Sequence, residues 1–172
     1  MNNYLFFLGH QPRISTAEIE AVFSAKNFDY NLESGDKNIL KLTTKKNIDP
    51  SILIEQLGGT VKITEQIADT NNVNDTIINF LQMAQPTGKI QFALNGKNNK
   101  YLSLEIKKIL KKSGRSVRYI EIKNTASILH NNLIKKQGDF TLINDEIYIT
   151  RAIQPIEDFV ERDFGRPSAN SK

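Results

Sequence analysis

Strand-length apolar runs alternate with helix-like segments along almost the whole chain of 172 residues, and this alternation constrains the fold more than any other feature. Strands that alternate with helices indicate a layered α/β or α+β architecture with some parallel pairing. The elements fall into two groups that meet at the polar stretch DTNNVND, near residue 70. We therefore predict a first unit over residues 1–70, an α/β unit over 71–154, and a polar tail over 155–172.

The first unit reads as strand, helix, strand, strand, helix, strand, which is the ferredoxin-like β-α-β-β-α-β order. Its first strand is YLFFLG and its last is TVKITEQIAD. Asp49 followed by Pro50 is typical of an N-cap and a first helical position, and predicts the start of the second helix.

The first helix carries a start signal of its own. Ser15 and Glu18 have the spacing of a capping box, in which each side chain accepts from the backbone N–H of the other residue. Ile14 and Ile19 have the spacing of the hydrophobic staple that often accompanies it. This motif predicts that the helix begins at Ser15.

In the second unit we expect a helix capped by Asn74 or Asp75, then the strand KIQFAL, and then a helix over NKYLSLEIKKILKKSG that stops at Gly114. The strand SVRYIEI, a short helix over TASILHNNLIKK, and the strands DFTLI and EIYITRAI complete the unit. The apolar face predicted for the helix before Gly114 consists of Leu102, Ile106, Ile109 and Leu110.

The positive charge is concentrated in one part of the chain. Residues 97–136 contain 11 basic and two acidic side chains, a net charge of +9, whereas the whole chain has a net charge of +4. Residues 1–96 and 137–172 are both net negative. A localised positive field of this kind is typical of a protein that binds a polyanion.

The centre of this segment is a lysine-rich helix. Lys107, Lys108, Lys111 and Lys112 lie within roughly 140° of arc at 100° per residue, opposite the apolar face. Phosphate backbones favour such clusters because each neutralised phosphate releases condensed counterions. The alternative is a solvated helix face that keeps the protein in solution. The candidate RNA-binding residues are Lys100, Lys107, Lys108, Lys111, Lys112, Arg115, Arg118, His130, Asn131, Lys135 and Lys136.

The sequence shows few signs of catalysis. It has no cysteine, two histidines (His10 and His130), and no spacing of His, Asp and Glu that predicts a metal site. Glycine-rich phosphate-binding loops and the G-x-S-x-G nucleophile motif are also missing. We therefore expect no cofactor in this chain. His130 is a candidate contact for RNA bases or sugars, and a hydrogen-bonding role at a helix end is an equal alternative.

No apolar run approaches the ~20 residues of a membrane span. The first residues lack the basic start and the small-residue cleavage site of a signal peptide. We expect a cytoplasmic protein without a membrane partner.

Three segments of the second half resemble the THUMP-containing tRNA guanine-N2 methyltransferases of the archaeal type and their bacterial relatives. They are SLEIKKILKKSGRSVRYIE, ASILHNNLIKKQGDFTLI and IYITRAIQPIEDFVERDFGRP. The closing RDFGRP is the most distinctive, since a similar run ends the RNA-binding half in that family. The resemblance covers residues 88–172 well and the first seventy residues more loosely, through YLFFLGHQPRISTAEIEAVF.

The resemblance implies an N-terminal ferredoxin-like domain and a THUMP domain that together hold tRNA by its acceptor stem and 3′ end. It also implies that residues 155–172 are a linker towards a catalytic domain that binds S-adenosylmethionine and that this chain lacks. Glu157, Asp158, Glu161 and Asp163 then belong to a solvated linker rather than to an acid/base or metal site.

Two other hypotheses stay open. The chain is alternatively the RNA-binding half of another THUMP-type enzyme, such as a thiouridine synthetase, in which case the coding sequence beyond Lys172 would show a pyrophosphatase-type loop. A third possibility is a non-catalytic protein-interaction module, which predicts an exposed apolar patch and no salt-dependent tRNA binding.

Overall fold

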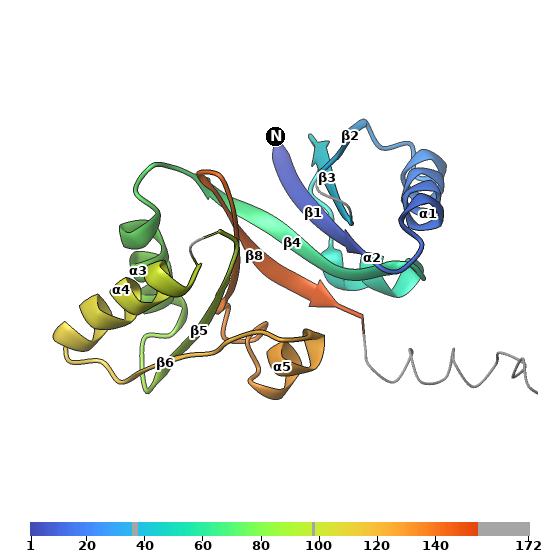
Figure 1. Ribbon diagram of the computed structural model, residues 1–172. Helices are drawn as coiled ribbons and strands as arrows, with labels where there is room; N and C mark the ends of the chain where they lie inside the picture. The colour runs from blue at the N-terminus through green and yellow to red at the C-terminus, as the bar shows by residue number, and fades with distance from the viewer. Residues whose placement is uncertain (36–37, 98, 155–172) are drawn as a thin grey trace, which may run out of the picture.

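A computed structural model describes residues 1–35, 38–97 and 99–154. Their strands form one eight-stranded sheet in the order β2-β3-β1-β4-β8-β7-β5-β6 (Figure 1). The strands are β1 (Asn2–Leu8), β2 (Tyr30–Ser34), β3 (Ile39–Thr44), β4 (Thr60–Asp69), β5 (Ile90–Asn95), β6 (Val117–Tyr119), β7 (Asp139–Ile143) and β8 (Glu146–Ile153). The helices of these residues are α1 (Pro12–Ala25), α2 (Pro50–Gln56), α3 (Val73–Ala84), α4 (Asn99–Lys112) and α5 (Thr125–His130).

The first half follows the predicted succession β1-α1-β2-β3-α2-β4. Its strands lie in the order β2-β3-β1-β4, and all neighbours are antiparallel. Alternate residues of β1, Tyr4, Phe6 and Leu8, point into a core with α1 and α2, as the twofold side-chain period of a strand requires. Asp49 caps α2 as predicted, accepting from the backbone N–H groups of Ser51 and Ile52.

The capping box predicted for the first helix is wrong. The N-cap is Gln11, four residues before Ser15, and the helix begins at Pro12. Ser15 is buried inside the helix and donates to the carbonyl oxygens of Gln11 and Gly59. Ile14 is 65% exposed, so the staple is absent as well. Pro12 explains the earlier start, because its fixed φ and missing N–H suit the first turn of a helix.

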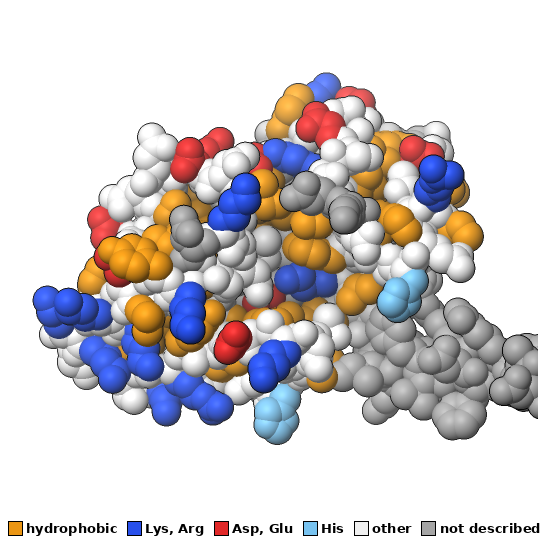
Figure 2. Space-filling view, viewed as in Figure 1, with side chains coloured by type: hydrophobic (Ala, Val, Ile, Leu, Met, Phe, Trp, Pro, Cys, Tyr) orange, Lys and Arg blue, Asp and Glu red, His pale blue; other side chains and the backbone are white. Residues whose placement is uncertain are grey.

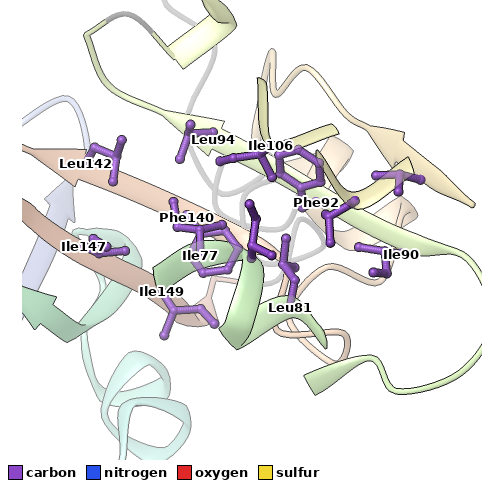
Figure 3. Packing of buried hydrophobic residues seen from close by; sticks show 13 residues of the cluster. Ile77, Leu81, Ile90, Phe92, Leu94, Ile106, Phe140, Leu142, Ile147 and Ile149 are labelled. Atoms are coloured by element: carbon purple, nitrogen blue, oxygen red, sulfur yellow. The ribbon is translucent and has the colours of Figure 1, made fainter. Parts of the chain in front are cut away.

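The second half places β5 between β6 and β7, with parallel pairing on both sides. Figure 3 shows the core on one face of these strands, where side chains of α3 and α4 meet those of β5, β7 and β8. Phe92 and Phe140 lie among Ile77, Leu81 and Ile106, all with no solvent exposure. A smaller cluster that includes Ile128 of α5 covers the other face.

Three predicted details of the second half differ from the structure. The helix capped by Asn74 or Asp75 in the prediction begins at Val73, after Asn72. Ile109, assigned to the apolar face of α4, is 42% exposed. The strand SVRYIEI is reduced to Val117–Tyr119, because β6 is the edge strand and pairs with β5 over three residues only.

The two halves share their sheet. β4 of the first half pairs with β8 of the second from Lys62 to Asp69, and the two long strands cross the middle of the molecule in Figure 1. The first core even includes Ala152 of β8. The predicted division at residue 70 thus falls at the end of β4, a strand that pairs with β8 of the second half. The division into two domains remains a prediction.

No helix among the described residues is long and apolar enough to cross a membrane. The predicted linker, residues 155–172, lies outside the described residues.

Candidate nucleic-acid interface

The lysines of α4 lie on its outer side, as the helical period predicts. Ser103, Ile106 and Leu110 are buried under the helix. Lys107 is half-buried, and Lys108, Lys111 and Lys112 are exposed. The four lysines, together with Leu104, line a shallow surface groove along the helix. Gly114, at a φ of 81°, then ends the helix in a left-handed conformation that suits glycine.

Lys and Arg side chains gather at the end of the molecule that α4 and β6 form, at the lower left of Figure 2. Arg118 projects from the edge strand β6 and is exposed, and Lys100 is exposed in the first turn of α4. We call Lys100, Lys107, Lys108, Lys111, Lys112 and Arg118 the basic surface.

The basic surface holds positive charge that no ion pair among the described residues neutralises. The ion pairs among the described residues use Lys41, Lys45, Lys62 and Arg151. No basic side chain of the described part of residues 97–136 takes part in one. Its cations are therefore free to bind an external anion.

Arg115 differs from the other candidates. Its guanidinium donates to the carbonyl oxygens of Gln85, Pro86 and Gly88, at 2.8 to 3.1 Å, and so holds the turn between α3 and β5. These bonds occupy several of the guanidinium N–H groups with which an arginine would otherwise bind a phosphate. Contact between Arg115 and RNA stays a prediction.

The remaining candidates lie at the end of α5 and just after it. His130 and Lys135 are exposed. Lys136 is half-buried and donates to the Gln91 side chain at 2.7 Å and to the Asn131 carbonyl at 3.2 Å. The Asn131 amide donates to Ser127 within the helix. Lys136 and Asn131 therefore stabilise the turn after α5, while His130 and Lys135 are available to a partner.

Two exposed residues of α4 were not among the sequence candidates. Tyr101 is 66% exposed and Leu104 is 55% exposed. The sequence could have indicated both residues. Tyr101, Leu104 and Lys108 are spaced i, i+3, i+7, so they lie on one face of the helix. The outer side of the helix thus combines lysines with an aromatic ring and an apolar side chain.

Nothing in the described residues indicates a metal centre. No group of three or more His, Asp or Glu side chains there is placed to hold an ion.

Comparisons with known proteins show a shared fold. No family model matches the chain, and no curated protein matches it in sequence. PH1313 from Pyrococcus horikoshii OT3 is similar in structure, with a TM-score of 0.58 and 13% identity over 90% of this chain and 55% of PH1313. TrmN from Thermus thermophilus aligns with a TM-score of 0.48 and 8% identity over 86% of this chain and 44% of TrmN.

The likeness to PH1313 extends over both halves of the described structure, since it covers 90% of the chain. The chain spans about half the length of each of these two proteins. At 13% identity, the fold is what the likeness to PH1313 establishes.

Proposed function

We propose that this chain binds tRNA for an S-adenosylmethionine-dependent tRNA guanine-N2 methyltransferase and holds it by the acceptor stem and the 3′ end. One observation carries the proposal: the basic surface, exposed except for the half-buried Lys107, has no ion-pair partner among the described residues and lies at one end of the molecule. Such a surface suits a phosphate backbone, because neutralised phosphates release counterions.

The fold supports the same proposal. The β-α-β-β-α-β succession and the strand order β2-β3-β1-β4 agree with a ferredoxin-like unit. The following unit, with its parallel strands and the lysine-bearing α4, is the part of the chain that resembles THUMP domains in sequence. The likeness to PH1313 in fold extends over both of these units.

By this proposal the chemistry belongs to another part of the enzyme. The family-like run RDFGRP would lead into the domain that holds S-adenosylmethionine and the target guanine. The residues described here would bind and orient tRNA.

A charge-reversal variant tests the proposal. Lys108, Lys111 and Lys112 are exposed, so replacing all three by Glu leaves the core intact. We expect tRNA affinity, measured by fluorescence anisotropy, to fall at least 100-fold. The matched control replaces Lys26, Lys45 and Lys46, which are exposed in the first half, by Glu. The control has the same net charge and should bind within a few-fold of the unchanged protein. Equal affinities of the two variants would refute the proposal.

Salt dependence gives a second measure of the same contacts. Each phosphate contact contributes roughly 0.7 to 0.9 to the slope of log affinity against log salt concentration. Lys108→Gln, Lys111→Gln and Lys112→Gln together should therefore lower the magnitude of the slope by about two to three. A slope that does not change would place the phosphate contacts elsewhere.

The 3′ end is tested separately. Unpaired ends are the parts of RNA that proteins recognise most specifically. We expect tRNA without its CCA terminus to bind more weakly than intact tRNA at the same salt concentration. Equal binding would confine the contact to the duplex.

A further inference from the structure

A second groove lies where three strands end together. β4, β5 and β7 run in the same direction, since β4 and β7 are both antiparallel to β8 and β5 is parallel to β7. Residues at or just beyond these strand ends, 71–74, 95–97 and 143–145, line a groove of about 1200 Å³ together with side chains of β1 and β3. The carboxyl ends of strands in α/β sheets are the usual place of ligand binding. We call this feature the strand-end groove.

Two helices begin at the strand-end groove. Val73 in the first turn of α3 lines it, and so do Tyr101 and Leu102 in the first turn of α4. The free N–H groups of a helix N-terminus favour a bound anion. Lys97 adds an exposed cation to the lining. Of the acids there, Glu146 is paired with Lys41 at 2.5 Å, and Asp145 is exposed.

Polar atoms at the groove lack partners. Thr141 is only 5% exposed, and its hydroxyl has no hydrogen-bond partner. The side-chain oxygen of Asn74 is also buried without one. A buried polar atom without a partner carries a free-energy cost, which a ligand that supplies the hydrogen bond relieves. Asn71 and Asn144 line the groove too, and both are exposed.

An aromatic ring stands at the rim. Tyr101 is 66% exposed, and one hydrogen bond of its hydroxyl orients the ring. Its hydroxyl donates to Glu105 at 2.7 Å, and Glu105 in turn accepts from Asn74 at 3.2 Å. Because Tyr101 and Lys100 are adjacent on α4, the ring lies where the basic surface meets the strand-end groove. Exposed, oriented aromatic rings are stacking platforms for unpaired bases.

We infer that the strand-end groove binds an unpaired nucleotide of RNA. Its base stacks on Tyr101, its phosphate lies near Lys97 and the first turns of α3 and α4, and the amides of Asn71 and Asn144 contact the edge of the base. Asparagine suits that contact because it both donates and accepts hydrogen bonds. The inference rests on the proposed function, since it adds a base-binding site to a surface that binds the phosphate backbone.

An extended peptide is the other macromolecule that a groove of this size takes. A peptide needs a free strand edge or apolar side-chain pockets. Leu5, Phe7 and Ile39 give part of the groove an apolar lining, so the strand edges distinguish RNA from a peptide. The strands that end at the groove, β4, β5 and β7, are each paired on both sides. A bound peptide is one outcome of the experiment and would overturn the inference.

The experiment uses the 172-residue chain and three probes: a single-stranded RNA hexamer, an RNA duplex, and a library of extended peptides. Tyr101→Leu should weaken hexamer binding about fivefold or more, which is the scale of one lost base stack. Tyr101→Phe should bind within about threefold of the unchanged protein, because it keeps the ring. Met83→Ala is the control, since Met83 is 82% exposed on α3 and does not line the groove.

Binding of the duplex separates this inference from the proposed function. Tyr101→Leu should leave duplex affinity within twofold, whereas the Lys108, Lys111 and Lys112 charge reversal should abolish it. Hexamer affinity that does not change in Tyr101→Leu would overturn the inference, and so would a peptide that displaces the hexamer. The proposed function would survive either result if the duplex still required the lysines. Loss of the lysine effect alone would refute the proposed function and leave the base-binding site standing.

Discussion

At the scale of single residues, the charge that matters most to stability lies between the halves rather than on the surface. Lys62 of β4 and Asp139 of β7 form an ion pair at 3.5 Å, with side-chain exposures of 9% and 0%. Asp139 also accepts from Thr150 and Asn95, and the Lys62 ammonium lies 4.3 Å from the centre of the Phe7 ring. Both charges are therefore compensated by hydrogen bonds and by each other.

Removing one member of this pair leaves a buried charge without its partner. We expect Lys62→Met to lower the free energy of unfolding by roughly 3–5 kcal/mol, measured by urea denaturation. The exposed pair of Lys45 and Asp29, at 3.2 Å, is the control. Lys45→Met should cost less than about 1 kcal/mol. Equal costs for the two variants would show that burial does not govern the Lys62 pair.

A buried tyrosine gives the fold an alkaline limit. Burial raises the pKa of Tyr148 well above its usual value of 10.0, and Glu146, which accepts from its hydroxyl, adds to the shift. The folded state therefore keeps the Tyr148 proton at a pH where the unfolded chain releases it. Stability is intact below pH 10 and falls as pH rises above it. Tyr148→Phe should flatten this fall in urea denaturation between pH 9.5 and 11.

Tyr4 shares this behaviour, because burial raises its pKa as well. Tyr30→Phe is the control, since Tyr30 is only half-buried. If Tyr148→Phe and Tyr30→Phe lose stability with pH equally, Tyr148 does not cause the alkaline limit.

At the scale of elements, α1 is held by contacts that replace the predicted capping box. The Glu18 carboxylate accepts from the backbone N–H groups of Gly58 and Gly59, at 2.6 and 2.9 Å. A Cβ at Gly59 would lie 2.1 Å from the Ser15 hydroxyl oxygen, so only glycine lets the loop approach the helix. Glu18 and Ser15 thus attach α1 to the loop between α2 and β4.

Loss of the Glu18 carboxylate should loosen this attachment. Glu18→Ala leaves two backbone donors without a charged acceptor, and we expect it to lower the free energy of unfolding by about 1.5–3 kcal/mol. Glu20→Ala is the matched control, because Glu20 is an exposed acid of the same helix. Similar thermal unfolding midpoints for the two variants would argue against a holding role for Glu18.

The sequence predicted the existence of these elements better than their boundaries. Apolar periodicity located α1, α3 and α4, and Asp49 with Pro50 located α2, because these signals depend on neighbouring residues only. Ser15 and Glu18 misled the prediction, since their partners lie about forty positions away in the chain. The lysines of the basic surface follow from the period of one helix, so the sequence predicted them. The hydrogen bonds from Arg115 to the turn at residues 85–88 join positions about thirty residues apart, so the sequence did not predict them.

At the scale of the whole molecule, the continuous sheet is the feature that the chain order did not reveal. The polar stretch near residue 70 suggested a boundary between two units. β4 ends at Asp69 as predicted, but it pairs with β8 of the second half. Sequence patterns indicate strands but not which strands pair across eighty positions. Besides the ladder, three ion pairs connect the halves: Lys41 with Glu146, Lys62 with Asp139, and Arg151 with Glu65.

Because one sheet and three ion pairs join the two halves, we expect the described structure to unfold as one unit. The chain contains no tryptophan, so single tryptophans report on chosen places. Phe28→Trp and Phe80→Trp put a probe at a half-buried position of each core. We expect both variants to show the same change in urea midpoint when Leu53→Ala, a core truncation in the first half, is added. That truncation should cost about 2–5 kcal/mol.

The reason is that unfolding of the first half would remove β4 from β8 and expose that edge of β8 along its whole length. It would also leave Glu146, Asp139 and Arg151 without their ion-pair partners. If Leu53→Ala leaves the urea midpoint reported by Phe80→Trp unchanged, the second half folds independently. With coincident transitions, the basic surface and the strand-end groove are held by one cooperative body, and tRNA binding at one end should protect the amide hydrogens of β1 and β4 from exchange as strongly as those of β5.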